Sequence, residues 1–234
     1  MLYLTLLIGL TLIVITTRLT QNLKLSSIWL LVGQISASFI IIMFGNLKVS
    51  HISQIELGYL SIPFSLLFLV GFTNVMNVEK EQKPLILLLP CISLVCLSIL
   101  GLVTGHSFVS MIGIFAVLTI TLVLLYGCIS GKGNIGRTFT TSIGFIIAVL
   151  SLSLLELSFV MIYIPIFTLI LPLVLYLLLQ NKITSVQSII ISSLIALLFS
   201  LIIFVIPFNI VWYLVIGFTV ILALSQLSNK HRFI

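Results

Sequence analysis

The sequence predicts an all-α fold, a polytopic bundle of transmembrane helices, and three observations lead to this fold class. Hydrophobic residues make up 61% of the 234 residues and charged residues only 6%, whereas soluble domains are about a quarter charged. The mean hydropathy is +1.44. The apolar segments also follow one another without a polar stretch long enough to fold separately. Residues 1–234 are therefore expected to form a single integral membrane domain.

The apolar segments have the length of membrane-crossing helices, which need about 20 residues each. Cutting the chain at its polar breaks gives about nine spans: roughly 2–19, 26–45, 57–77, 84–104, 107–129, 138–155, 157–179, 186–206 and 209–227. The first segment lacks the basic region and cleavage site of a signal peptide, so we expect it to remain as a span.

Two of the breaks between spans are short. One is the pair Gly105-His106, and the other is the single charge of Glu156 inside a long apolar stretch. That stretch, residues 138–179, is too long for one crossing. We therefore expect a tight turn near Glu156.

The basic residues predict the orientation of the bundle. Only Lys48 falls in a loop on the opposite side from the other nine Lys and Arg residues, which are Arg18, Lys24, Lys80, Lys83, Lys132, Arg137, Lys182, Lys230 and Arg232. Because basic loops remain cytoplasmic, the N-terminus is predicted outside and the C-terminus inside. This bias and the attraction of anionic lipid headgroups explain the net charge of +6. No nucleic-acid partner is expected.

Acidic residues are scarce, and the sequence contains no aspartate. Only Glu79 and Glu81 lie close together, in a cytoplasmic run that also contains Lys80 and Lys83. Two neighbouring carboxylates are suitable ligands for Mg²⁺. The other interpretation is a solvated loop whose charges neutralise each other.

Two asparagines lie near the cytoplasmic end of the third predicted span. Asn74 and Asn77 are three residues apart, so they share one face of a helix. Amides inside membrane helices either join neighbouring helices by hydrogen bonds or line a ligand cavity, and the sequence leaves both interpretations open.

Several segments resemble the polyprenyl-phosphate N-acetylhexosamine-1-phosphate transferases, which start the lipid intermediates of peptidoglycan and teichoic acid. They are Leu-Val-Gly-Gln-Ile-Ser-Ala at 31–37, Phe-Gly-Asn-Leu at 44–47, and the stretches 55–63 and 70–77. The last ends in Asn74-Val-Met-Asn77, where the family has Asn-Ala-x-Asn before an Asp-Gly-x-Asp-Gly-Leu motif. The resemblance covers roughly residues 10–180 and implies cytoplasmic active-site loops. It also implies that the chain begins later than the family's, without one or more N-terminal helices.

The resemblance breaks at the residues that carry the family's chemistry. The family's Asp-Asp pair falls on Thr20 and Gln21, two motif aspartates fall on Lys80 and Lys83, and a metal-binding aspartate falls on Arg137. The family's catalysis depends on Mg²⁺ held by carboxylates. At about 4 Å one contact between like charges costs about 1–4 kcal/mol. These cations therefore disfavour a divalent metal, although a cationic pocket can still bind phosphate directly.

We therefore expect a catalytically inactive relative of these transferases in a bacterial cytoplasmic membrane. It would bind polyprenyl phosphate, or a partner such as a membrane enzyme or a second copy of the chain, in cell-envelope glycan synthesis. No catalytic residue and no cofactor is expected, and the candidate groove comprises Asn74, Asn77, Lys80, Lys83 and Arg137.

Two alternatives remain. The first is a divergent, active undecaprenyl-phosphate transferase that holds Mg²⁺ with Glu79, Glu81 and Asn77. The second is a small transporter or channel subunit. Transporters usually carry ionisable residues within their spans, and only Glu156 is such a candidate here. This counts against ion-coupled transport.

Overall fold

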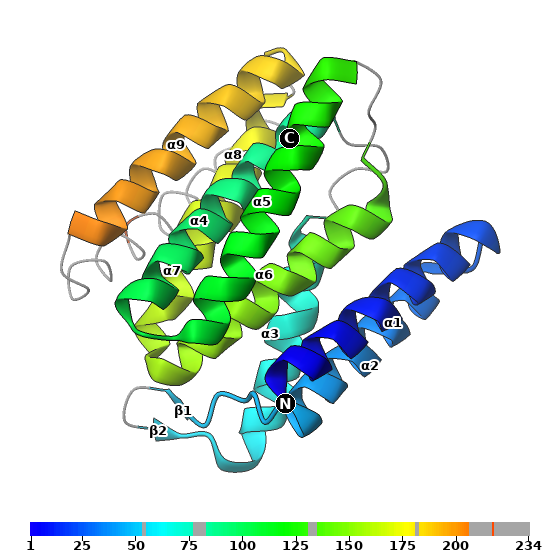
Figure 1. The fold of residues 1–234 in the computed structure, drawn as a ribbon, viewed down its shortest axis with the longest axis vertical. Coiled ribbons are helices and arrows are strands. Elements are labelled where there is room, and N and C mark those ends of the chain that lie inside the picture. Colours follow the sequence, from blue (N-terminus) through cyan, green and yellow to red (C-terminus); the bar gives the residue numbers. More distant parts are fainter. Residues whose placement is uncertain (53–54, 77–82, 131–134, 181–182, 206–216, 218–234) are drawn as a thin grey trace, which may run out of the picture.

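The chain forms a bundle of long apolar helices (Figure 1). The computed structural model describes residues 1–52, 55–76, 83–130, 135–180, 183–205 and 217. Eight helical segments within these residues are long and apolar enough to cross a membrane. They correspond to the first eight predicted spans, and the predicted all-α membrane fold is confirmed. Nearly all of the ninth predicted span, 209–227, lies outside the described residues.

The helices follow the predicted spans closely. In chain order the elements are α1 (Leu2–Asn22), α2 (Ser27–Phe44), β1 (His51–Ile52), β2 (Ile55–Glu56), η1 (Gly58–Leu60), α3 (Ser61–Val75), η2 (Pro84–Leu87), α4 (Leu88–Val103), α5 (Ser107–Ser130), α6 (Arg137–Leu157), η3 (Phe159–Ile162), α7 (Tyr163–Pro165), η4 (Ile166–Ile170), α8 (Leu171–Gln180) and α9 (Ser185–Val205). The short helices η1 and η2 extend α3 and α4 at their starts, so each pair forms one span.

Both short breaks are turns, as predicted. Between α4 and α5, Gly105 adopts φ +70°, a left-handed conformation that glycine reaches without steric cost. The His106 N–H then donates to the Gly101 carbonyl at 2.8 Å and closes the turn. After α6, Ser158 is extended, with φ −158° and ψ 130°, which ends the helix directly after Glu156 and Leu157.

Prolines interrupt the seventh span without ending it. Pro165 is followed by a π-helical turn, η4, and the chain then continues as α8 with Pro172 at its second position. A proline has no N–H to donate, and a wider turn is one way in which a helix accommodates that loss. The Thr168 hydroxyl donates to the Ile164 carbonyl (2.7 Å), and its oxygen also lies 3.0 Å from Ser93 Oγ in a hydroxyl–hydroxyl contact that joins this turn to α4.

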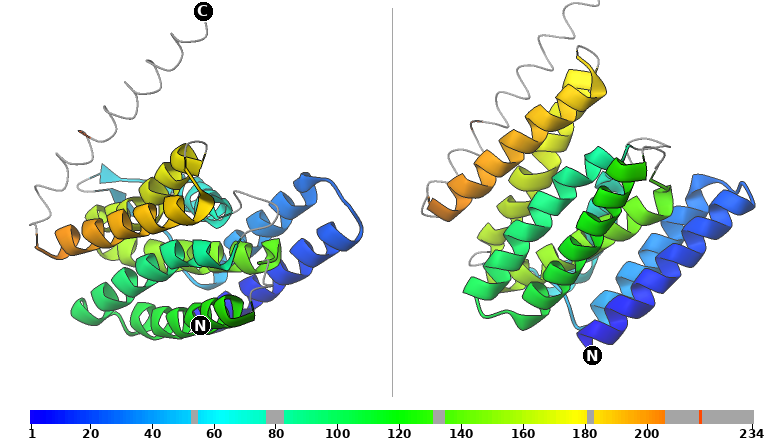
Figure 2. Two further views of the ribbon diagram at one scale, coloured as in Figure 1. Left: turned by 90° about the horizontal axis from the view of Figure 1, so that it is seen from above. Right: turned by 45° about the horizontal axis from the view of Figure 1, so that its top comes forward.

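Helix α6 is the centre of the bundle. It packs against α3, α1, α4 and α5, whereas α1 and α2 form a pair at one edge and α9 lies at the other (Figure 2). About 78% of the α6 span is buried, against 28% of the α1 span. Helix α6 therefore contacts protein nearly all round, and α1 exposes a broad apolar face suited to lipid.

A short β-hairpin is the one element that the sequence did not predict. Strands β1 and β2 pair antiparallel, with His51 opposite Glu56. The segment before the hairpin is fixed to α3, because the Val49 N–H donates to Ser65 Oγ (3.0 Å) and the Ser65 hydroxyl donates to the Ser61 carbonyl (2.7 Å). Two-residue strands are too short to produce an alternating hydrophobic pattern, which explains why the sequence gave no sign of them.

The bundle has two chemically different ends. We call the end where α1, α3 and α5 finish the basic end, because the described cations Arg18, Lys24, Lys83 and Arg137 lie there. We call the opposite end the hairpin end. It carries the β-hairpin and the remaining described Lys, Arg and Glu side chains, which are Lys48, Glu56 and Glu156. In the predicted orientation the basic end faces the cytoplasm.

Candidate functional site

Asn74, a predicted site residue, joins two helices at the basic end. Gln34 of α2 donates from Nε2 to Asn74 Oδ1 at 3.0 Å, and Asn74 of α3 donates from Nδ2 to Gln34 Oε1 at 2.7 Å. Asn74 Nδ2 also lies 3.0 Å from the Val70 carbonyl. Gln34 is only 1% exposed. Of the two interpretations of Asn74, the structure favours helix joining.

Removing Asn74 should leave the buried Gln34 amide without its partner. We expect Asn74→Leu to lower the free energy of unfolding by about 1–3 kcal/mol, the cost of an unpaired buried amide. The double variant Gln34→Leu/Asn74→Leu should recover part of that loss, with a coupling of about 1 kcal/mol between the two sites. Denaturation titrations of the four proteins in detergent micelles measure this coupling. Strictly additive losses would contradict the pairing.

The segments that the family resemblance assigns to its motifs meet at the basic end. The Thr138 hydroxyl of α6 donates to Gln21 Oε1 of α1 at 3.4 Å. Gln21 is where the resemblance places an aspartate of the family's Asp-Asp pair, and Thr138 is next to Arg137 at the start of α6. The structure therefore brings together two positions that are 117 residues apart in the chain.

Helices α3 and α6 approach closely one to two turns below this contact. A Cβ atom built on Gly144 would lie 2.5 Å from the Thr73 carbonyl oxygen, so only a glycine permits the observed spacing. Thr73 is fully buried and directly precedes Asn74. This contact sets the position of the C-terminal end of α3 relative to the start of α6.

A largely apolar cavity lies beside this cluster. Its volume is about 230 Å³, and it is lined by Pro84, Val123, Tyr126, Gly127, Ile135, Gly136 and Phe139. Three segments enclose it: the start of η2, the last turns of α5 and the start of α6. Tyr126 is 72% exposed on the outer face of α5, so the cavity reaches the surface that would contact lipid. Gly127 packs directly on Pro84, where an added Cβ would lie 2.6 Å from the ring.

Lys83 and Arg137, two of the predicted site residues, are chain neighbours of residues that line this cavity. Lys83 directly precedes Pro84, and Arg137 directly follows Gly136. Lys83 is exposed, and Arg137 is half-buried. Gly136 precedes the first residue of α6, and the first turn of that helix contains no acidic residue. The N-terminus of a long helix offers unpaired N–H groups and favours a negative charge. The edge of the cavity is thus suited to an anion.

The other predicted site residues cannot be placed. Asn77, Lys80, Glu79 and Glu81 lie outside the described residues, so their part in the groove and the Mg²⁺ alternative stay predictions. Where the chain is described, no three His, Cys, Asp or Glu side chains come close enough to hold a metal.

Sequence reasoning missed the cavity and the partner of Asn74. Gln34 stood out only as part of the family resemblance, although a glutamine in the middle of an apolar span is itself a signal of interhelical hydrogen bonding. The cavity wall comes from Pro84, Tyr126 and Phe139, which are far apart in the chain and apolar like their neighbours. No local pattern distinguishes them.

No protein-family model matches the chain, and a search among curated proteins finds no match. The resemblance to the sugar-phosphate transferases therefore stays a prediction.

Proposed function

We propose that the basic end binds the phosphate of a polyprenyl phosphate, with the isoprenoid chain entering the adjacent apolar cavity. The protein would be a catalytically inactive relative of the polyprenyl-phosphate sugar-1-phosphate transferases. It would lie in a bacterial cytoplasmic membrane and serve cell-envelope glycan synthesis as a regulatory or assembly component.

The proposal depends on one observation. An apolar cavity is lined in part by two residues that are each next to a cation in the chain. Pro84 and Gly136 both line it, and Lys83 and Arg137 are their immediate neighbours in the chain. A polyprenyl phosphate combines the two chemistries that such a site recognises, a hydrocarbon chain and a doubly charged headgroup. Arginine can bind a phosphate through two parallel N–H donors, and lysine adds a point charge.

The contacts at the basic end also support the resemblance on which the proposal rests. In the family the motifs converge on one cytoplasmic site. Here the corresponding segments are joined by the Gln21–Thr138 hydrogen bond and by the shared cavity of Pro84 and Gly136. The cationic replacements argue against transfer chemistry at this end.

The direct test is lipid binding to the full-length chain purified in detergent. Undecaprenyl phosphate should bind in native mass spectrometry or in a thermal-shift titration. Undecaprenol, which has the same hydrocarbon chain and no phosphate, should bind at least about tenfold more weakly, because each hydrogen bond to a charged group contributes about 1.5–3 kcal/mol. Equal affinity for the phosphate and the alcohol would contradict the proposal.

A further inference from the structure

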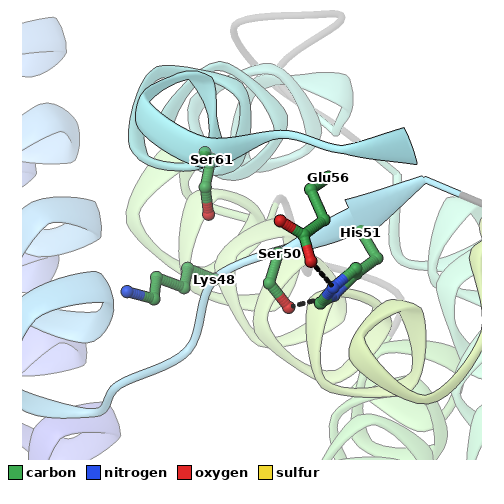
Figure 3. Close-up of a pocket in the computed structure, with 6 residues that line it drawn as sticks. Lys48, Ser50, His51, Glu56 and Ser61 are labelled. Carbon is green, nitrogen blue, oxygen red and sulfur yellow. Dashed lines mark hydrogen bonds and ion pairs between the residues drawn. The ribbon is translucent and has the colours of Figure 1, made fainter. Parts of the chain in front are cut away.

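A second polar site lies at the hairpin end of the bundle (Figure 3). A cavity of about 250 Å³ lies between the hairpin and the start of α3, and it is lined by Lys48, Ser50, His51, Glu56, Gly58 and Ser61. Cavities for drug-sized ligands measure about 300–1,000 Å³. This one therefore suits a smaller polar group.

The hairpin orients two of the polar side chains. His51 and Glu56 are cross-strand partners, and His51 Nε2 lies 3.4 Å from Glu56 Oε1. On the other side of the ring, His51 Nδ1 lies 3.0 Å from Ser50 Oγ. The His51 and Glu56 side chains are 58% and 82% exposed, and exposed pairs of this kind contribute little to stability. The Glu56 carboxylate therefore remains accessible.

Ser61 supplies an unpaired hydroxyl at the inner wall of the cavity. The residue is only 4% exposed, and its Oγ has no hydrogen-bond partner. Figure 3 shows the hydroxyl pointing into the space between Lys48 and Glu56. Ser65, one turn later on α3, has both its donor and acceptor roles filled by Ser61 and Val49. Ser61 is one of eight described side chains with a buried, unpaired polar atom, and it belongs to the lining of this cavity, so a hydrogen-bonding ligand bound there would supply the partner that buried polar groups usually have.

The charges around the cavity favour a ligand that carries both signs. Lys48 contributes a cation on one side, and Glu56 contributes a carboxylate on the other, with the Lys48 amine pointing away from Glu56 (Figure 3). A carboxylate opposite a lysine disfavours a simple anion. The two charges suit a zwitterion whose cationic group faces Glu56.

The cavity lies beside the first residue of a candidate membrane span. Gly58, part of its lining, is the first residue of the third span, Gly58–Val75. The next two residues, Tyr59 and Leu60, are 100% and 65% exposed. An exposed tyrosine at the start of an apolar helix is typical of the membrane–water interface.

We propose that this cavity binds the headgroup of a phospholipid that carries both a phosphate and a primary amine. The phosphate accepts hydrogen bonds from the Lys48 ammonium and the Ser61 hydroxyl, and the lipid ammonium donates to the Glu56 carboxylate. The site is separate from the basic end and does not depend on the function proposed there.

The test compares short-chain lipids on the full-length chain in detergent. Dihexanoyl phosphatidylethanolamine should bind about tenfold more tightly than dihexanoyl phosphatidylglycerol, because only the former offers an ammonium to Glu56. In Glu56→Gln this preference should disappear. Lys48→Gln and Ser61→Ala should weaken binding of the ethanolamine lipid, whereas Lys24→Gln at the basic end should leave it unchanged. Ser36→Ala is the control for Ser61→Ala, because the Ser36 hydroxyl is already bonded to the Val32 carbonyl.

Two results would overturn the proposal. One is equal binding of the two lipids with no effect of Glu56→Gln. The other is binding of free phosphoethanolamine or inorganic phosphate as tight as that of the lipid, since a soluble phosphate would then be the ligand of the cavity.

Discussion

Replacing Gly144 by alanine should lower the free energy of unfolding by about 1–3 kcal/mol, the usual cost of overpacking a close helix contact. The added Cβ would lie 2.5 Å from the Thr73 carbonyl oxygen. Because that oxygen belongs to the α3 backbone, no rotation of a side chain relieves the clash, and the two helices must separate. The separation would also disturb Asn74 and the start of α6, so polyprenyl-phosphate binding should weaken in the same variant.

The matched control is a glycine in a helix that has free space around it. Gly71 lies on α3, two residues before Thr73, and a Cβ built on it meets nothing within 4 Å. Gly71→Ala should therefore be neutral or slightly stabilising, since alanine is the better helix former. Unfolding titrations in detergent compare the two variants. Equal stability of both would mean that α3 and α6 do not pack as described.

Reversing the two charges at the edge of the cavity should abolish binding of polyprenyl phosphate. In Lys83→Glu/Arg137→Glu, two attractive contacts to the phosphate are lost and two repulsive ones replace them. Each charge-assisted hydrogen bond contributes about 1.5–3 kcal/mol, so the affinity should fall by a factor on the order of a hundred or more. Binding is measured by native mass spectrometry with undecaprenyl phosphate, and undecaprenol serves as the uncharged reference.

A second double charge reversal tests whether binding depends on the cations next to the cavity or on the net charge of the basic end. Arg18→Glu/Lys24→Glu changes the charge of the basic end by the same amount, but neither residue is next in the chain to one that lines the cavity, as Lys83 and Arg137 are. This control should keep most of the affinity. If both double variants lost binding equally, the net charge of the basic end would explain binding and the cavity would not.

The fold could be predicted from the sequence because a bilayer places a simple constraint on any chain that crosses it. Each of the first eight predicted spans is a helix within a few residues of its predicted bounds, since a chain in lipid must satisfy its backbone groups internally. The turn at Gly105 was predicted from the polar break Gly105-His106, and the turn near Glu156 from one charge within an apolar stretch that is too long for a single crossing. The hairpin at residues 51–56 could not be predicted in this way, because its strands pair only two residues each.

The candidate site was less accessible to sequence reasoning. Lys83 and Arg137 were found because they replace acids in a resemblance, and the structure places both beside one cavity. The pairing of Asn74 with Gln34 depends on how α2 meets α3, a contact between residues 40 apart that no local spacing encodes. The unpaired Ser61 hydroxyl is likewise visible only once the loop before the hairpin is fixed on α3.

Transfer activity tests the central claim most directly. The full-length chain would be incubated with undecaprenyl phosphate, a nucleotide-diphosphate N-acetylhexosamine and Mg²⁺, with lipid binding followed in the same sample. We expect the lipid phosphate to bind and to remain unmodified at every Mg²⁺ concentration. Mg²⁺-dependent formation of a polyprenyl-diphosphate sugar would contradict the account, and its loss in Glu79→Gln/Glu81→Gln would identify the chain as a divergent transferase.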